Sequence, residues 1–101
     1  MGHSFGGATT GAVVASDARF RAALTMAAPV SILGGFDARG FHVPYLFLVA
    51  LEDNSIGLAG NQLMRMDYRS VGAPAWWVEL ADAGHWSWSD LAGLVPAFQA
   101  G

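Results

Sequence analysis

The sequence contains no cysteine and no lysine, and charged residues of any kind are few. The absence of cysteine excludes a disulfide framework, a thiolate metal site and a cysteine nucleophile. The five positive charges are all arginine, they form no cluster, and the net charge is −3. Binding to nucleic acid or to an anionic membrane surface needs clustered basic residues. We therefore expect no nucleic-acid partner.

Long hydrophobic runs are also missing. The longest apolar run, residues 43–51, contains Pro44 and is far shorter than the ~20 residues that cross a bilayer, so no membrane span is expected. Apolar residues nevertheless make up 53% of the chain, while charged residues make up 13%, about half the roughly 25% of an ordinary soluble domain. This composition excludes intrinsic disorder and is more typical of the interior of a larger protein.

Strands that alternate with helices and loops indicate an α/β fold with right-handed crossovers. Residues 43–51 are apolar at successive positions, which is typical of a strand in a parallel sheet with helices on both faces. Further strands are predicted over residues 20–30 and 75–80. The remaining predictions are a turn over 2–7, helices over 8–15, 57–70 and 91–100, and loops over 31–42 and 81–90.

A serine motif lies near the start of the chain. Gly2-His3-Ser4-Phe5-Gly6 fits G-x-S-x-G, the nucleophile elbow, in which a sharp strand-to-helix turn tolerates only small neighbours. The N-terminus of the following helix would stabilise negative charge at the serine, and the Phe5 N–H is a candidate oxyanion donor. A glycine-rich turn with a surface serine is the plainer interpretation of these five residues.

A serine nucleophile needs a histidine base and an acid that orients it. Asp53 follows the predicted strand over 43–51, and His85 lies in the loop after the strand over 75–80. The order Ser, acid, His is the order of α/β-hydrolases. Glu52 is an alternative acid that faces the other side if the strand continues, and Asp37, after the first strand, is a third.

Three stretches carry a resemblance to a known family: GHSFGGATTG, PYLFLVALED and WWVELADAGHWSWSD. Together they resemble the C-terminal half of an α/β-hydrolase, most of all the dienelactone-hydrolase-like, platelet-activating-factor-acetylhydrolase-like and cutinase-like esterases. The resemblance implies Ser4 as nucleophile, His85 as general base and Asp53 as acid, with no metal or organic cofactor. The acetylhydrolase branch often has its acid where this sequence has Ala27 and Ala28, which favours Asp53 here.

Other candidate residues have plainer interpretations. His3 is predicted to pack or hydrogen-bond behind the elbow, and His42 to lie in a surface loop. Ser89 or Asp90 is predicted to cap the last helix. Trp86, next to the proposed base, is a candidate for lining the acyl pocket. No spacing of histidine, aspartate and glutamate indicates a metal site.

The resemblance places several strands and helices before the elbow. We therefore expect residues 1–101 to be a partial α/β-hydrolase domain, from nucleophile elbow to C-terminal helix, with about three parallel strands and the N-terminal half absent. The expected function is hydrolysis of small-molecule carboxylic esters by a serine hydrolase that is weak or inactive alone. A catalytically silent fragment or interaction module is the alternative. The exposed sheet edge is a candidate for self-association or complementation.

Overall fold

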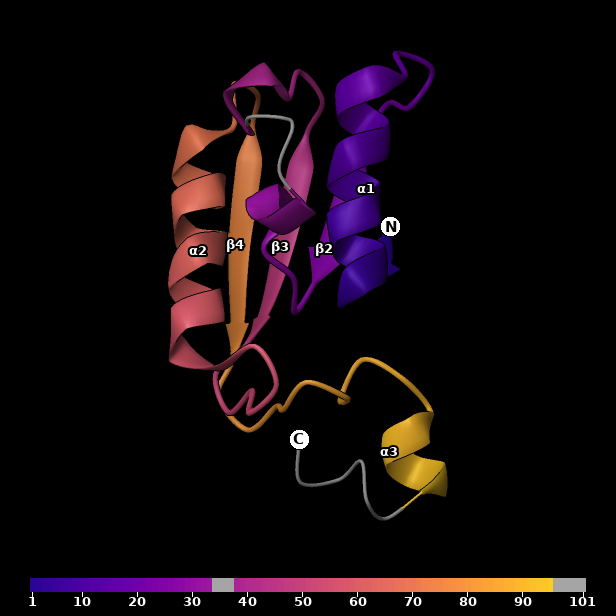
Figure 1. Ribbon diagram of the computed structural model, residues 1–101, viewed down its shortest axis with the longest axis vertical. Coiled ribbons are helices and arrows are strands. Elements are labelled where there is room, and N and C mark those ends of the chain that lie inside the picture. The colour runs from indigo at the N-terminus through magenta and orange to yellow at the C-terminus, as the bar shows by residue number, and fades with distance from the viewer. Residues whose placement is uncertain (34–37, 96–101) are drawn as a thin grey trace.

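Four parallel strands form one sheet in the order β1-β2-β3-β4, and helices connect them (Figure 1). The computed structural model describes residues 1–33 and 38–95. The strands are β1 (Gly2–His3), β2 (Ala23–Met26), β3 (Tyr45–Ala50) and β4 (Ala75–Leu80). The helices are α1 (Phe5–Ser16), α2 (Gly57–Ser70) and α3 (Leu91–Leu94), with short 3-10 helices η1 (Val30–Leu33) and η2 (Ala38–Gly40).

The α/β class is confirmed, as are β4 and α2 with the predicted bounds. The described sheet has one strand more than the three that the sequence pattern indicates, because Gly2 and His3 pair with Thr25 and Met26 as strand β1. Two residues are too few to show a strand pattern, so they were predicted as part of a turn. The strand expected over 20–30 is also shorter, since Ala27 adopts a φ of 49° and leaves the extended conformation.

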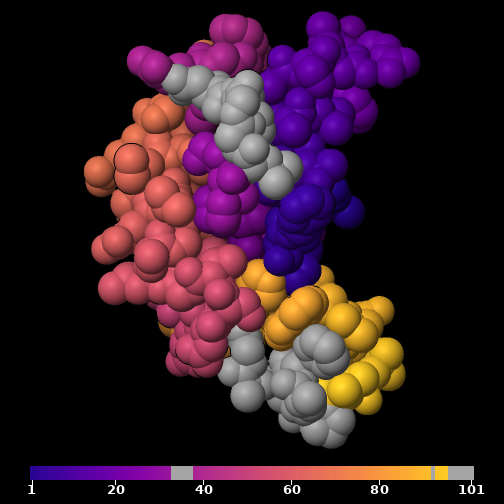
Figure 2. Space-filling model, viewed as in Figure 1, coloured from indigo at the N-terminus to yellow at the C-terminus, as the bar shows by residue number. Residues whose placement is uncertain are grey.

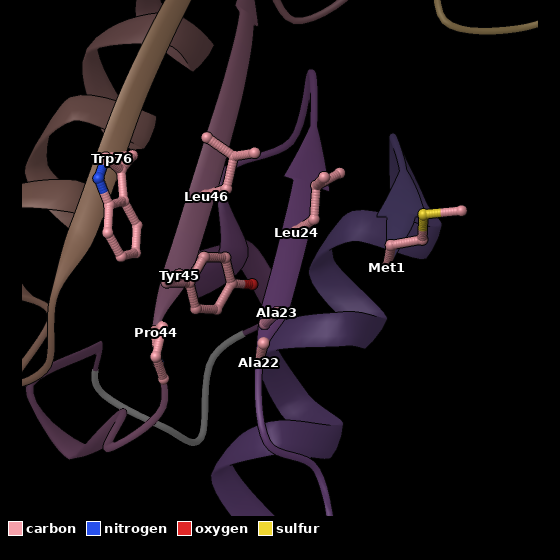
Figure 3. Close-up of a pocket in the computed structure, with 8 residues that line it drawn as sticks. All are labelled: Met1, Ala22, Ala23, Leu24, Pro44, Tyr45, Leu46 and Trp76. Carbon is pink, nitrogen blue, oxygen red and sulfur yellow. The ribbon is translucent and has the colours of Figure 1, made fainter.

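Both long helices cover the same face of the sheet (Figures 1 and 3). The order of the strands in the sheet is their order along the chain, so every crossover runs in the same direction across the sheet. Right-handed crossovers that all run in one direction place their helices on one face. The covered face carries alternate strand residues that are fully buried: Thr25, Tyr45, Phe47 and Val49. The expectation of helices on both faces is therefore wrong for the described part of the chain.

The opposite face of the sheet, here called the open face, is apolar. Leu24, Leu46 and Trp76 form one row across three strands, and Figure 3 shows them in front of the strands with the helices behind. Trp76 is 54% exposed, and Val78, in the next row, is 42% exposed. The described elements thus leave one apolar face of the sheet in contact with solvent.

The carboxyl ends of the parallel strands lie at one edge of the sheet, where loops after them can bring side chains together. Ser4 follows β1, Asp53 follows β3 and His85 follows β4. Helix α3 lies beyond the same end of the strands (Figure 1). The helix predicted over 91–100 begins at Leu91 but already ends at Leu94, because Val95 adopts an extended conformation; residues 96–100 lie outside the described residues. Within the described ranges, no helix is long and apolar enough to cross a membrane.

Candidate active site

Ser4 stands on the strained turn between β1 and α1. Its N–H donates to the Met26 carbonyl at 2.9 Å, which extends the pairing of β1, and its backbone then turns with a φ of 55°. Serine at a helix N-cap ordinarily bonds its hydroxyl to a first-turn N–H. Within the described residues the Ser4 side chain makes no such cap, and its Oγ hydrogen-bonds His85 instead. A strained serine that leaves its own helix uncapped is typical of a functional site.

The turn is crowded at two glycines. A Cβ on Gly2 would lie 2.0 Å from the Gly6 carbonyl oxygen, and a Cβ on Gly7 would lie 2.4 Å from Thr25 Oγ1. A Cβ on Gly6, by contrast, would meet open space among the described residues. The requirement for a small residue that the motif predicts therefore holds at Gly2. The second position without room for a Cβ is Gly7 and not Gly6.

Asp53 is buried and held by both carboxylate oxygens. Its Oδ1 accepts the N–H groups of Ser55 and Ile56, each at 2.8 Å, and its Oδ2 lies 2.7 Å from His85 Nδ1. These two backbone donors were not predicted from the sequence, although an aspartate side chain commonly accepts the backbone N–H two residues further on in a turn. Glu52 is exposed. Asp37, the third candidate acid, lies outside the described residues.

His85 lies between Ser4 and Asp53, and only 2% of its surface is exposed. A carboxylate can only accept, so His85 Nδ1 carries the proton and donates to Asp53. Its Nε2 then offers a lone pair to the Ser4 hydroxyl, whose Oγ lies 2.8 Å away. The loops after β3 and β4 are tied by a hydrogen bond from the Glu52 N–H to the Ala83 carbonyl at 2.9 Å. The structure thus brings the three sequence-predicted residues into one hydrogen-bonded chain.

Two aromatic side chains pack against this imidazole. The ring of His3 lies 4.8 Å from that of His85, and the ring of Trp86 lies 5.0 Å from it, edge-on. Figure 2 shows the segment after β4 lying against the N-terminal residues at this end of the molecule. Burial lowers the pKa of His3 and outweighs the hydrogen bond to the His85 carbonyl, which raises that pKa. His42 is exposed, and Ser89 Oγ accepts the Leu91 N–H at the start of α3.

A small apolar cavity adjoins the serine. It has a volume of about 190 Å³, and it is lined by Ser4, Phe5, Ala8, Ala27, Ala28, Pro29, Ile32 and Ile56. Trp86 is not among the described residues that line it. A larger hollow of about 400 Å³ lies on the open face at the amino ends of the strands (Figure 3), and Ser4 is not among the described residues that line it. The smaller cavity is the one that a group bonded to Ser4 Oγ could enter.

One backbone donor, the Phe5 N–H, directly follows Ser4 in the chain. Phe5 is the first residue of α1, so its N–H has no acceptor within the helix and can serve an anion beside Ser4. The described residues contain no group of three or more histidine, aspartate or glutamate side chains that could hold a metal ion. The chemistry that this arrangement can perform is proton transfer to and from a serine hydroxyl.

The chain matches no protein-family model and no curated protein sequence. It is similar to a solved structure from Klebsiella pneumoniae described as a dienelactone hydrolase, with 25% identity and a TM-score of 0.62; the match covers 83% of this chain and 38% of that one. It is also similar to an esterase domain from Rhodothermus marinus, with 18% identity and a TM-score of 0.66, covering 98% of this chain and 57% of that one.

The chain therefore spans well under two thirds of either structure. The match to the Rhodothermus marinus domain, at 18% identity, concerns the fold alone. Both neighbours are members of the α/β-hydrolase fold, and they share with this chain a parallel sheet flanked by helices. By its fold, this protein is similar to the α/β-hydrolases.

Proposed function

We propose that this protein is a serine hydrolase that cleaves carboxylic esters through Ser4, His85 and Asp53. The observation that carries the proposal is the hydrogen-bonded chain from Ser4 Oγ through His85 to Asp53, at 2.8 and 2.7 Å. A surface serine in a glycine-rich turn would have no need of a buried imidazole and a buried carboxylate aligned behind it. The structural neighbour described as a dienelactone hydrolase, at 25% identity, supports the same reaction class.

In the first half of the reaction, Ser4 Oγ attacks the ester carbonyl carbon while His85 Nε2 takes the hydroxyl proton. The carbonyl oxygen becomes an oxyanion, to which the Phe5 N–H donates. Asp53 stays ionised and stabilises the imidazolium through its bond to Nδ1. When the intermediate collapses, the bond from carbon to the alcohol oxygen breaks and His85 returns its proton to that oxygen. An acyl group is left on Ser4.

In the second half, a water molecule replaces the alcohol. His85 Nε2 takes one proton from the water, the hydroxide attacks the acyl carbon, and the bond to Ser4 Oγ breaks as that oxygen regains the proton. The products are a carboxylic acid and free enzyme. No group beyond the three side chains and the oxyanion donor is required to balance these steps.

The cavity beside Ser4 supports a preference for small apolar acyl groups. An apolar cavity of about 150 Å³ is large enough to hold a benzene molecule. The 190 Å³ cavity here is therefore matched to a short aliphatic or a single-ring acyl group, and a long fatty acyl chain would extend beyond it. We expect nitrophenyl butyrate to be cleaved faster than nitrophenyl laurate.

We expect the 101-residue chain by itself to react slowly. The elbow serine of this fold uses a second oxyanion donor from an earlier loop, and loss of one donor costs about 10²–10³ in rate. A catalytically silent fragment or interaction module, which keeps these residues without using them, would not react at Ser4 at all.

The test is labelling of the purified chain with a fluorophosphonate, which phosphonylates activated serines and releases fluoride. We expect folded protein to be labelled at Ser4, with the site located by mass spectrometry, and Ser4→Ala to remain unlabelled. Urea-unfolded protein is the control for reactivity that does not depend on the fold. Folded wild-type protein that is labelled no faster than Ser4→Ala would overturn the proposal.

A further inference from the structure

His3 makes a contact that the proposed reaction does not use. It is the last residue of β1 and directly precedes Ser4, and its half-buried imidazole packs against the rings of His85 and Trp86, with centroids 4.8 and 5.4 Å away. Its Nε2 is hydrogen-bonded to the backbone carbonyl oxygen of His85, 82 residues further along the chain. One side chain thus joins the strand that carries the serine to the loop that carries the imidazole.

The chemistry of this bond defines its direction. A carbonyl oxygen can only accept, so His3 Nε2 carries a proton and donates it. The acceptor belongs to the main chain of His85, whose side chain makes two further bonds, to Ser4 and to Asp53. A shift of this backbone would therefore move Nε2 of His85 relative to Ser4 Oγ. Misplacement of a reacting group by about 1 Å can cost 10²-fold in rate.

We propose that His3 is a positioning residue: its hydrogen bond to the His85 carbonyl holds the imidazole of His85 in line with Ser4 Oγ. The catalytic consequence rests on the proposed function, while the positioning itself does not. The side chain suits this task because it is attached one residue before Ser4. Any movement of the elbow is then transmitted to the loop that carries His85, and the distance between the two reacting groups is kept.

The electrostatics of the pair are compatible with this role. Burial lowers the pKa of His3 and outweighs its hydrogen bond to the His85 carbonyl, which raises that pKa; of the two titratable groups that act on it, His85 lowers it and Asp53 raises it. A neutral His3 still donates through Nε2. It also adds no positive charge beside His85 at the moment when that ring becomes an imidazolium. The bond therefore orients the base without opposing its protonation.

The experiment compares His3→Phe, which keeps a ring in contact but loses the donor, with His3→Gln, whose amide nitrogen can reach the same carbonyl. His42→Phe, in an exposed loop, is the matched control. The first readout is the rate of fluorophosphonate labelling at Ser4, separated into maximal rate and probe affinity. We expect His3→Phe to lower the maximal rate by about tenfold or more with affinity unchanged, and His3→Gln to recover most of the loss.

The second readout needs no reactivity. The proton on His85 Nδ1, bonded to Asp53, gives a downfield proton NMR signal while the imidazole is held in place. We expect this signal to broaden or vanish in His3→Phe and to persist in His3→Gln and His42→Phe. Thermal unfolding identifies variants that fail to fold, and if His3→Phe does not fold, His3→Asn, whose amide is too short, takes its place.

The labelling rate and the NMR signal together distinguish failure of the proposed function from failure of this inference. If wild-type protein is not labelled but the NMR signal behaves as expected, the ester-hydrolase proposal fails and the positioning role of His3 stands. If the variant that lacks the donor keeps both the wild-type labelling rate and the wild-type signal, the positioning role is wrong. A loss in His3→Phe that His3→Gln does not recover would also overturn it, because the donor would then not be the cause.

Discussion

Asp53 and Glu52 are adjacent in the chain, but Asp53 is buried and Glu52 is exposed. The Asp53 carboxylate accepts hydrogen bonds from two backbone N–H groups and from His85, whereas Glu52 is exposed. A buried carboxylate with three donors is held in one orientation, and it can fix the tautomer of the imidazole. An exposed carboxylate one residue away has no such constraint, so the two acids are readily separated by substitution.

Asp53→Asn is expected to lower the rate of ester hydrolysis or of fluorophosphonate labelling by about 10⁴-fold, because an amide does not hold the required tautomer of His85. Glu52→Gln is the matched control and is expected to change the rate by less than about twofold. Labelling kinetics on both folded variants measure the difference. Loss of reactivity in Glu52→Gln with Asp53→Asn still active would identify the wrong acid.

His3 is also expected to affect how the free energy of unfolding changes with pH. Burial lowers its pKa in the folded state, so below the unfolded value of about 6.5 the unfolded chain binds more protons than the folded chain. Its contribution to stability is therefore complete above that pH and is lost as the pH falls through the folded pKa. We expect wild-type protein to lose more unfolding free energy between pH 7.5 and 5 than His3→Gln does.

Urea unfolding of both proteins at the two pH values measures this difference. The comparison isolates His3, because the other histidines, His42 and His85, are common to both proteins. Equal losses in the two proteins would show that His3 is not protected from protonation by the fold.

At the level of elements, the connection from β1 to α1 has almost no room for side chains. β1 approaches the first turn of α1 so closely that a Cβ on Gly2 would lie 2.0 Å from the Gly6 carbonyl. At Gly6 itself the space is open, and the residue lies within α1, where glycine costs roughly 0.5–1 kcal/mol relative to alanine. The two glycines of one motif therefore have opposite tolerances.

Gly2→Ala is expected to destabilise the protein by about 1–3 kcal/mol or more, because backbone must move to admit the methyl group. Gly6→Ala is expected to be neutral or to stabilise by up to about 1 kcal/mol. Urea unfolding gives both values, and fluorophosphonate labelling reports whether the elbow is still formed. A larger loss in Gly6→Ala than in Gly2→Ala would contradict the crowding argument.

At the level of the whole molecule, the open face is the main departure from an ordinary soluble surface. It presents a layer of aliphatic and aromatic side chains from three adjacent strands, of which Trp76, Val78 and Leu80 are the most exposed. Soluble monomers rarely expose contiguous apolar patches larger than a few hundred Å². Within the part of the chain that the structure describes, β4 is moreover an edge strand of the sheet. Both features favour association of the 101-residue chain.

Replacement of Trp76 and Val78 by threonine is expected to reduce concentration-dependent association, because threonine suits a strand while adding a hydroxyl to the open face. Light scattering after size-exclusion chromatography at several protein concentrations measures the change. Leu58→Thr, at a residue that is 75% exposed on α2, is the matched control for an isolated apolar residue. An unchanged association of the double variant would show that the open face is not the contact.

Much of the architecture could be predicted from the chain because its strands and helices have strong local patterns. The run over 43–51 and the segment 57–70 have patterns long enough to identify them as β3 and α2. Ser4 could be predicted from its short motif, and Asp53 and His85 from their positions after predicted strands. β1 could not be predicted, since two residues become a strand only by pairing with β2.

The sequence by itself determined the α/β class, the order of Ser4, Asp53 and His85 along the chain, and the absence of thiol and lysine side chains. The tertiary structure alone decided that Asp53 rather than Glu52 reaches His85 and that His3 hydrogen-bonds to the His85 carbonyl. It also decided that α1 and α2 cover the same face of the sheet. The physical reason is that composition and periodicity depend on neighbours in sequence. Hydrogen bonds between residues some 80 positions apart depend on the register of parallel strands.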